Sequence, residues 1–202
     1  MLIGVIITYQ EARFITRSIK SLQPYCKRII VVDGAYADYP RFLPEHRSTD
    51  GTQEIARNLG AEVIESDVPW KDQVVKRNVY INEAKNNDII IHIDADEQWV
   101  GKPNFRGDYP GYQVPVIESV SKKQDHWIRV FTKTPQLHYE GGHNLLFDGD
   151  NMLRPVHCPI MKDVEIKHCK YMRGKERIDK NWEYYYTQTE QEREFRKAND
   201  CP

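Results

Sequence analysis

A short apolar run that ends in three carboxylates constrains this chain more than any other feature. Residues 89–93 read Ile-Ile-Ile-His-Ile, a β-branched run typical of a strand that is buried on both faces. Asp94, Asp96 and Glu97 follow it directly. Because a buried strand does not carry three carboxylates inside it, we expect them at its carboxyl end, where open α/β sheets bind their ligands.

The spacing of the first two carboxylates indicates a metal site. In an extended segment, residues i and i+2 project to the same side, so Asp94 and Asp96 can converge on one point. Oxygen ligands of this kind suit hard divalent cations. An Asp-x-Asp pair alone is common, and a polar loop after a strand is the alternative interpretation. His92 lies inside the apolar run and is expected to be a hydrogen-bonded core or sheet-face histidine.

Composition limits the class of protein. The chain has 202 residues, of which 40% are hydrophobic and 29% charged, with a net charge of -1. This describes a globular chain without a global attraction to nucleic acid or anionic membranes. No apolar run approaches the roughly 20 residues of a membrane span, and residues 2–7 are expected to form a first strand rather than a signal peptide. With four dispersed cysteines, we expect reduced thiols and a cytoplasmic location.

Alternating apolar runs and amphipathic stretches predict an α/β fold with a mostly parallel sheet flanked by helices. Such alternation implies parallel strands joined by right-handed crossovers. We expect strands at 2–7, 28–32, 62–65 and 89–93, and helices at about 11–22, 48–60 and 71–85. The later strand-like segments, which predict a small mixed or antiparallel second layer, are 112–120, 127–133 and 136–139.

One domain over residues 1–172 with a helical appendage over residues 173–202 is the simplest organisation. Residues 175–197 have a helical pattern in which Ile178 and Trp182 are spaced to dock on the body of the domain. The sequence contains no internal repeat, no linker and no low-complexity segment.

The predicted sheet gathers several polar segments at one edge. Residues 8–11 follow the first strand, Asp33 follows the second, and Asp50 precedes the second helix. An isolated Asp at a strand end is usually a helix cap or turn former, but several of them beside an Asp-x-Asp indicate a ligand-binding crevice. Arg77 either is a solvated helix residue or faces this crevice, where a guanidinium group can balance carboxylates or hold a phosphate.

Five polar segments of the chain form a recognisable series. They are Ile6-Ile7-Thr8-Tyr9-Gln10-Glu11, Val31-Val32-Asp33-Gly34, Ser48-Thr49-Asp50-Gly51-Thr52, Arg77-Asn78 and Asp94-Ala95-Asp96-Glu97. In these segments and their order, the chain resembles family-2 glycosyltransferases, which have the GT-A fold, a Rossmann-like arrangement. Two later segments, 129–131 and 139–143, resemble a small bacterial and phage-type branch. The chain departs from the pattern where residues 35–47 separate Asp33 from Ser48, and where His143 is followed by Asn rather than the Glu common in that branch.

The resemblance implies a nucleotide-diphosphate sugar donor, foremost a UDP-sugar, and a divalent metal, Mn²⁺ or Mg²⁺. Asp96 would be the direct metal ligand, with Asp94 and His143 as further ligands. The acceptor stays open among a saccharide, a lipid-linked saccharide, a protein and a modified nucleic acid. The residues implied to contact the nucleotide are Thr8, Tyr9, Glu11, Asp33, Asp50, Arg77, Asp94 and Ala95.

An inverting transfer, which the resemblance also implies, needs a general base within hydrogen-bond reach of the acceptor hydroxyl. By residue type and position, the candidates are Glu97, Glu118, Asp125 and Glu140. Glu118 fits the polar side of an edge strand equally well, and Asp125 fits a turn. Arg77 is the candidate catalytic cation beside the diphosphate.

Two other classes of protein remain open. A sugar nucleotidyltransferase shares the metal and the sheet edge, but it usually has a glycine-rich phosphate loop after its first strand, and residues 8–11 contain no glycine. The other class is a non-catalytic module that binds carbohydrate or nucleotide. The intact Asp94-Ala95-Asp96 with Arg77 argues against such a module, whereas the missing Glu after His143 favours it.

Overall fold

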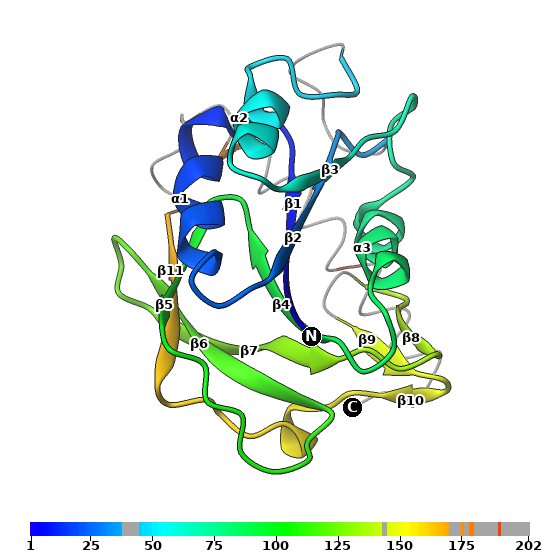
Figure 1. Cartoon of the computed structure of the whole chain (residues 1–202), viewed down its shortest axis with the longest axis vertical. Helices are drawn as coiled ribbons and strands as arrows, with labels where there is room; N and C mark the ends of the chain where they lie inside the picture. The colour runs from blue at the N-terminus through cyan, green and yellow to red at the C-terminus, as the bar shows by residue number, and fades with distance from the viewer. Residues whose placement is uncertain (38–44, 143–144, 170–174, 176–177, 180–189, 191–202) are drawn as a thin grey trace.

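An eight-stranded sheet with helices on both faces forms the body of the molecule, and a smaller three-stranded sheet lies beside it (Figure 1). The computed structural model describes residues 1–37, 45–142, 145–169, 175, 178–179 and 190. The predicted appendage over 173–202 therefore lies almost entirely outside the described residues.

The first half of the chain follows the predicted alternation of strands and helices. Its elements are β1 (Leu2–Thr8), α1 (Ala12–Leu22), β2 (Arg28–Asp33), α2 (Thr52–Asn58), β3 (Glu62–Ile64), α3 (Gln73–Glu83) and β4 (Ile89–Asp94). β3, β2, β1 and β4 are neighbours in this order and run parallel. The α/β class and the crossover connections are thus confirmed.

The second half adds antiparallel strands. Its elements are β5 (Glu97–Gly101), β6 (Gly111–Glu118), β7 (Gln124–Thr132), β8 (Leu137–Tyr139), β9 (Leu146–Asp148), β10 (Asn151–Met152), the 3₁₀-helix η1 (Pro155–His157) and β11 (Val164–His168). The large sheet has the order β3-β2-β1-β4-β7-β6-β11-β5, and β8, β9 and β10 form the small antiparallel sheet.

β6 and β7 extend the large sheet, whereas the sequence led us to expect them in the second layer. The physical reason is the free edge of β4, whose apolar residues need a partner on that side. Ile90 pairs with Phe131 and Ile91 with Val130 in the antiparallel β4–β7 ladder. All four side chains are at most 1% exposed, so the pairing completes the core. Of the predicted second layer, only β8 lies in the small sheet.

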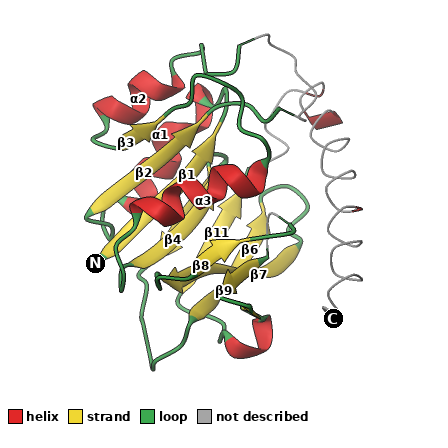
Figure 2. Cartoon of the chain, turned by 90° about the vertical axis from the view of Figure 1, so that its right-hand side faces the viewer, coloured by secondary structure: helices red, strands yellow, loops and turns green. Residues whose placement is uncertain are grey.

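Alternate residues of the central strands face two separate cores. Ile6, Val31 and Ile93 pack toward α1 and α2, whose Ile15, Ile19 and Ala56 belong to the same cluster. Residues of the other parity in β1, β2 and β4 pack with Tyr80 and Ile81 of α3 and with the small sheet. Figure 2 shows α3 on one face of the sheet and α1 on the other. Strands that are apolar on both faces are what such a three-layer arrangement requires.

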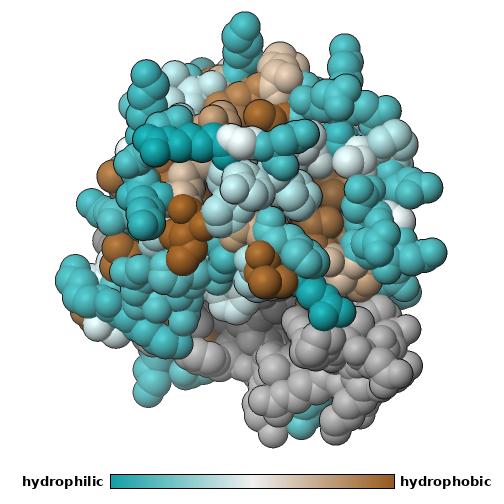
Figure 3. Space-filling view, turned by 90° about the horizontal axis from the view of Figure 1, so that it is seen from below, coloured by the Kyte–Doolittle hydropathy of each residue, from teal (hydrophilic) through white to brown (hydrophobic). Residues whose placement is uncertain are grey.

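The surface shows no large apolar area on the face seen in Figure 3. Hydrophilic side chains dominate the described part of this face, and the hydrophobic ones occur in small separate groups. Scattered hydrophobic side chains of this kind are ordinary on a folded protein. Among the described residues, no helix has the length and apolar character that crossing a bilayer requires.

The segment after residues 35–47 caps the start of α1. Three consecutive backbone N–H groups, which have no partner inside the helix, donate to side chains of this segment. Gln10 N donates to Ser48 Oγ at 2.7 Å, Glu11 N to Thr52 Oγ1 at 2.8 Å and Ala12 N to Asp50 Oδ2 at 2.9 Å. The other Asp50 oxygen accepts from Thr52 N at 3.1 Å. Asp50 therefore joins the first turns of α1 and α2.

We predict that Asp50→Ala lowers the free energy of unfolding by about 1–2 kcal/mol, since it removes a capping side chain. For a chain of this size the melting temperature should fall by about 2–8 °C, measured by circular dichroism. Asp150→Ala, at an exposed turn residue, is the control and should leave the melting temperature unchanged. Equal effects of the two substitutions would contradict the capping role.

Candidate functional site

The carboxyl ends of five strands meet at one edge of the large sheet. β1, β2 and β4 are parallel, and β6 runs in the same direction because β7 is antiparallel to both β4 and β6. β11 is parallel to β6. The last residues of these strands are Thr8, Asp33, Asp94, Glu118 and His168. The fold thus collects polar side chains at the edge where α/β sheets bind ligands.

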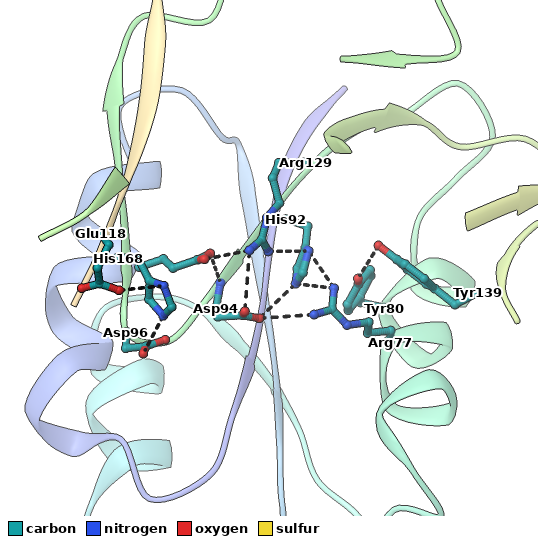
Figure 4. Close-up of polar contacts among 10 residues, drawn as sticks. Arg77, Tyr80, His92, Asp94, Asp96, Glu118, Arg129, Tyr139 and His168 are labelled. Carbon is teal, nitrogen blue, oxygen red and sulfur yellow. Dashed lines mark hydrogen bonds and ion pairs between the residues drawn. The ribbon is translucent and has the colours of Figure 1, made fainter. Parts of the chain in front are cut away.

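Asp94 is at the centre of a buried ionic cluster (Figure 4). Its carboxylate lies 3.5 Å from an Arg77 nitrogen and 3.8 Å from an Arg129 nitrogen. Glu97 accepts a hydrogen bond from Arg129 at 2.7 Å and another from the Asp94 backbone N–H at 2.8 Å. Burial opposes the charged form, but the nearby His92 ring and the two arginines hold the pKa of Asp94 well below its usual range. Asp94 is therefore ionised and fixed in place.

His92 separates the two guanidinium groups. It is 1% exposed, and its Nδ1 lies 2.9 Å from an Arg77 nitrogen and 3.2 Å from an Arg129 nitrogen. Burial and the positive charge of Arg77 lower the pKa of His92 to about 3, so the ring is neutral. Its Nε2 lies 3.4 Å from Asp94, and Tyr80 stacks on the ring at 5.6 Å. The predicted hydrogen-bonded core histidine is confirmed.

Asp96 has a different partner from Asp94. Asp96 is 2% exposed, and its Oδ2 lies 3.1 Å from His168 Nε2. The other ring nitrogen of His168 lies 3.5 Å from Glu118 (Figure 4). Burial favours the neutral imidazole, but the hydrogen bond and charge of Asp96 outweigh it and raise the pKa of His168 to about 9. At neutral pH, His168 therefore carries a proton between two carboxylates.

Asp96, Glu118 and His168 have the donor types that Mn²⁺ accepts, and the carboxylates suit Mg²⁺. Oε1 of Glu118 is buried without a hydrogen-bond partner, so a carboxylate oxygen is available beside His168. Within the described ranges, no three His, Cys, Asp or Glu side chains are gathered as ready-made ligands of one ion. The chemistry of Asp96 and His168 therefore fits a metal whose ligand set is completed on binding. His143 lies outside the described residues.

Lys76 is a buried cation at the same edge. It is 1% exposed, and its Nζ donates to the backbone oxygens of Thr8 at 2.7 Å and Gly34 at 2.6 Å. The Tyr36 ring lies 5.1 Å from the ammonium group. Burial lowers the pKa of Lys76 to about 7, although the charge of Asp33 opposes this shift. Lys76 thereby ties together the carboxyl ends of β1 and β2.

The segment after β1, which the resemblance implies to contact the nucleoside, is closely packed. Thr8, Tyr9 and Glu11 are at most 9% exposed. The Tyr9 hydroxyl donates to the backbone oxygen of Glu45 at 2.7 Å. Ala95 is 2% exposed, next to the two Asp residues of the Asp-x-Asp.

Asp33 is bound to the segment that follows residues 35–47. Its two oxygens accept hydrogen bonds from Ser48 Oγ at 2.5 Å and Ser48 N at 2.9 Å, and Oδ2 also accepts from Gln53 at 2.6 Å. Ser48 and Gln53 thus contact Asp33 even though residues 35–47 separate them from it in the sequence. Asp50 lies at the first turn of α1, as described above.

Of the four candidate bases, Glu97 is bonded to Arg129 as described above, and the other three have different surroundings. Glu118 lies beside His168 in the cluster of Figure 4. Asp125, across from Val116 in the β6–β7 ladder, is half-exposed and pairs with Lys123 at 3.2 Å. The Glu140 side chain is 57% exposed and lies 3.2 Å from His138. Of the three, Glu118 is the one that the described structure brings to the ionic cluster.

Unpartnered buried polar atoms are concentrated at this edge. In the described part of the chain, six buried side-chain nitrogen or oxygen atoms lack a hydrogen bond. Five of them belong to residues that end a strand of this edge or contact Asp94, and the sixth belongs to the first residue of α3. Such groups are rare in folded proteins, and their grouping marks a place where a ligand can supply partners. The atoms are Thr8 Oγ1, Gln73 Oε1, Arg77 Nε, Asp94 Oδ1, Glu118 Oε1 and Arg129 Nε.

Sequence reasoning gave no role in the site to Arg129, His168 or Gln73. Val164 and Ile166 alternate with charged residues, which is a strand signal. The insertion of β11 between β6 and β5, which brings His168 to Asp96, has no local sequence signal.

We predict that Arg129→Met lowers the free energy of unfolding by about 3–5 kcal/mol, because it leaves Glu97 buried without its cationic partner. Adding Glu97→Gln should recover most of this loss in chemical denaturation. Arg28→Met, which breaks a more exposed pair with Glu62, is the control and should cost about 0–1 kcal/mol. A double variant no more stable than Arg129→Met would show that the pair is not coupled.

The lowered pKa of Lys76 predicts a pH-dependent stability. Because the folded-state pKa is about 7 and that of an unfolded lysine about 10.4, the unfolded state binds one more proton between these values. The free energy of unfolding should therefore rise with pH from 7 to 10 in the wild type relative to Lys76→Met. The expected slope is about 1.4 kcal/mol per pH unit at most, measured by guanidinium unfolding. Parallel pH profiles of the two proteins would contradict a deprotonating Lys76.

Comparison with known proteins adds independent information. No family model matches the chain. Among solved structures, it is similar to Staphylococcus aureus TarS 1–349, with a TM-score of 0.48, 14% identity and coverage of 84% of this chain and 60% of that chain. It is also similar to glucosyl-3-phosphoglycerate synthase from Mycobacterium tuberculosis, in complex with Mn²⁺, UDP and glucosyl-3-phosphoglycerate, with a TM-score of 0.40, 20% identity and coverage of 58% and 43%.

Curated sequences give a partial match at higher identity. An uncharacterized glycosyltransferase of Rickettsia prowazekii is 36% identical over 93 residues, which is 46% of this chain and 27% of that protein. One of Rickettsia felis is 38% identical over 93 residues, which is 46% of this chain and 28% of that protein. The chain thus spans about a quarter of the length of the curated relatives it matches. Over the matched residues, the chain is similar to these glycosyltransferases.

Proposed function

We propose that this protein transfers a glycosyl group from a nucleotide-diphosphate sugar to an acceptor hydroxyl. A UDP-sugar is the preferred donor, the transfer inverts the anomeric centre, and a divalent metal assists it. The observation that carries the proposal is the group of buried, unpartnered polar atoms around Asp94, Arg77 and Arg129 at the carboxyl edge of the sheet. A charged diphosphate can satisfy the donors of this group, and the partial match to glycosyltransferases supports the same reaction class.

The two arginines would stabilise the leaving nucleoside diphosphate. Arg77 and Arg129 each keep a buried Nε–H group without a partner. Donors fixed in a water-poor site act strongly on charge that develops as the glycosidic bond breaks. Asp94 and Glu97 hold both guanidinium groups in place, so little rearrangement is needed when the diphosphate forms.

Asp96 and His168 would hold the metal. When bound, Mn²⁺ or Mg²⁺ supplies Lewis-acid stabilisation of the diphosphate. His168 must release its proton to act as a ligand. Glu118, whose Oε1 lacks a hydrogen bond, would then accept the proton of the acceptor hydroxyl as general base. Of the remaining candidates, Asp125 and Glu140 are more exposed and already paired, and Glu97 is bonded to Arg129.

A non-catalytic module that binds a nucleotide or carbohydrate is the second candidate function. In the described residues, Asp94 faces cations and Asp96 faces protonated His168, and no metal ligand set is assembled. A protein of this kind would bind the nucleotide without turning over the donor.

Thermal melting against UDP, GDP, CDP and dTDP, with and without Mn²⁺, tests the proposal. A nucleotide at about 100 times its dissociation constant adds roughly 2.7 kcal/mol, which shifts the melting temperature by about 5–10 °C. We expect one nucleotide to stabilise the protein only with Mn²⁺, and we expect Asp96→Ala to abolish this shift. Asp150→Ala is the control for the substitution itself.

Release of the nucleoside diphosphate from the matching nucleotide-sugar separates the two candidate functions. Slow hydrolysis of the donor without an acceptor supports the transferase, and its loss in Glu118→Gln supports the assigned base. Nucleotide binding without any donor turnover points to the binding module. No stabilisation by any nucleotide, with or without Mn²⁺, would refute the transferase and the nucleotide-binding module, and it would leave only a module that binds carbohydrate.

A further inference from the structure

Two adjacent residues of the inner face of α3 reach three different strand ends. Lys76 contacts the end of β1 and the loop after β2, and Arg77 contacts the end of β4. Tyr80 lies one turn further along and stacks on His92. This face consists of buried residues at helical spacing, which are Gln73, Lys76, Arg77, Tyr80 and Ile81.

Gln73 lies at the end of this face that points past the strands. α3 follows the carboxyl end of β3 and precedes the start of β4, so its first turn lies at the carboxyl edge of the sheet. Three residues of α-helix rise about 4.5 Å, which places Gln73 roughly that distance beyond the level of Lys76. Because Lys76 bonds the backbone of Thr8, the last residue of β1, the direction of α3 puts Gln73 on the side of Lys76 toward the carboxyl edge.

The amide of Gln73 is buried and incompletely bonded. The residue is 3% exposed, and its Oε1 has no hydrogen-bond partner. Oγ1 of Thr8 is also buried without a hydrogen-bond partner. An unpaired buried acceptor destabilises a folded protein, and a site built to bond a ligand's N–H or O–H leaves such a group unpaired when empty.

We propose that Gln73 is a donor-specificity residue, whose side-chain oxygen accepts a hydrogen bond from an O–H or N–H group of the nucleoside part of the sugar donor. The inference rests on the proposed function. It assigns the nucleoside to the space between the first turn of α3 and the end of β1, next to Thr8. The hydrogen-bond donor is a ribose hydroxyl or a ring N–H of the base, and nucleotide analogues separate the two.

The test compares Gln73→Met with Gln113→Met. Met has about the length of Gln but no hydrogen-bonding groups. Gln113 is the control because its amide nitrogen is bonded within the protein: Nε2 donates to the backbone oxygens of Pro155 at 3.0 Å and Cys158 at 2.7 Å. Calorimetric titration with UDP and Mn²⁺, or with the nucleoside diphosphate selected by the melting series, gives the dissociation constants. Melting without ligand gives the stabilities.

We expect Gln73→Met to weaken nucleotide binding about 5- to 10-fold while the melting temperature without ligand stays the same or rises, because removing an unpaired acceptor costs no hydrogen bond. Gln113→Met should lower the melting temperature and leave the dissociation constant unchanged. If the partner is the 2′-hydroxyl, the 2′-deoxy nucleotide should bind wild type and Gln73→Met equally. If the partner is the 3′-hydroxyl, the 3′-deoxy nucleotide should bind both proteins equally instead. If the partner is a ring N–H, both deoxy nucleotides should keep the full difference.

Two results would overturn the inference in distinguishable ways. If wild type binds the nucleotide and Gln73→Met binds it equally well, Gln73 has no role in recognition, whereas the proposed function stands. If wild type binds no nucleotide, the proposed function fails and the role of Gln73 fails with it. Gln73→Ala serves as a second variant if Gln73→Met does not fold.

Discussion

The arrangement of the carboxyl edge depends on the pairing of buried carboxylates with two guanidinium groups. Asp94 and Glu97 are held at the end of an apolar strand where ionised groups are costly unless they are paired. Arg77 reaches them from α3 and Arg129 from β7, so one ionic cluster connects a helix of the parallel half with a strand of the antiparallel half. Neutral His92 lies between the guanidinium groups. The cluster therefore joins the two halves of the chain at the site itself.

The parallel half of the fold could be predicted because its signals are local. Continuous apolar runs such as Ile89–Ile93 mark strands buried on two faces, and helical spacing marked α1 by Phe14, Ser18 and Leu22, all of them buried. The position of β7 against β4 could not be predicted, since an apolar strand with a free edge accepts any suitable partner. For the same reason, Arg129 and His168 could not be placed near Asp94 and Asp96: both arrive through long-range strand pairing.

The resemblance and the structure give different information about the Ser48–Thr52 segment. The motif led us to expect a nucleotide contact from Asp50, and the contacts of the segment are with the backbone at the start of α1 and with Asp33. Short side-chain oxygens are suited to helix N-termini. A motif that recurs next to a binding site can thus keep the loop backbone in shape, and sequence alone does not separate that task from direct contact with a ligand.

The position of β11 has a consequence for how the site is assembled during folding. This strand lies between β6 and β5, so a segment near the end of the described chain is inserted between two strands that were synthesised much earlier. Contacts of such high sequence separation close large loops and tend to form late. The parallel half can collapse on its own apolar strands, but Asp96 gains its His168 partner only when β11 docks. The parallel half is therefore expected to form before this site, and a ribosome-bound chain that lacks residues 164–168 would be folded in part and would lack the Asp96–His168 pair.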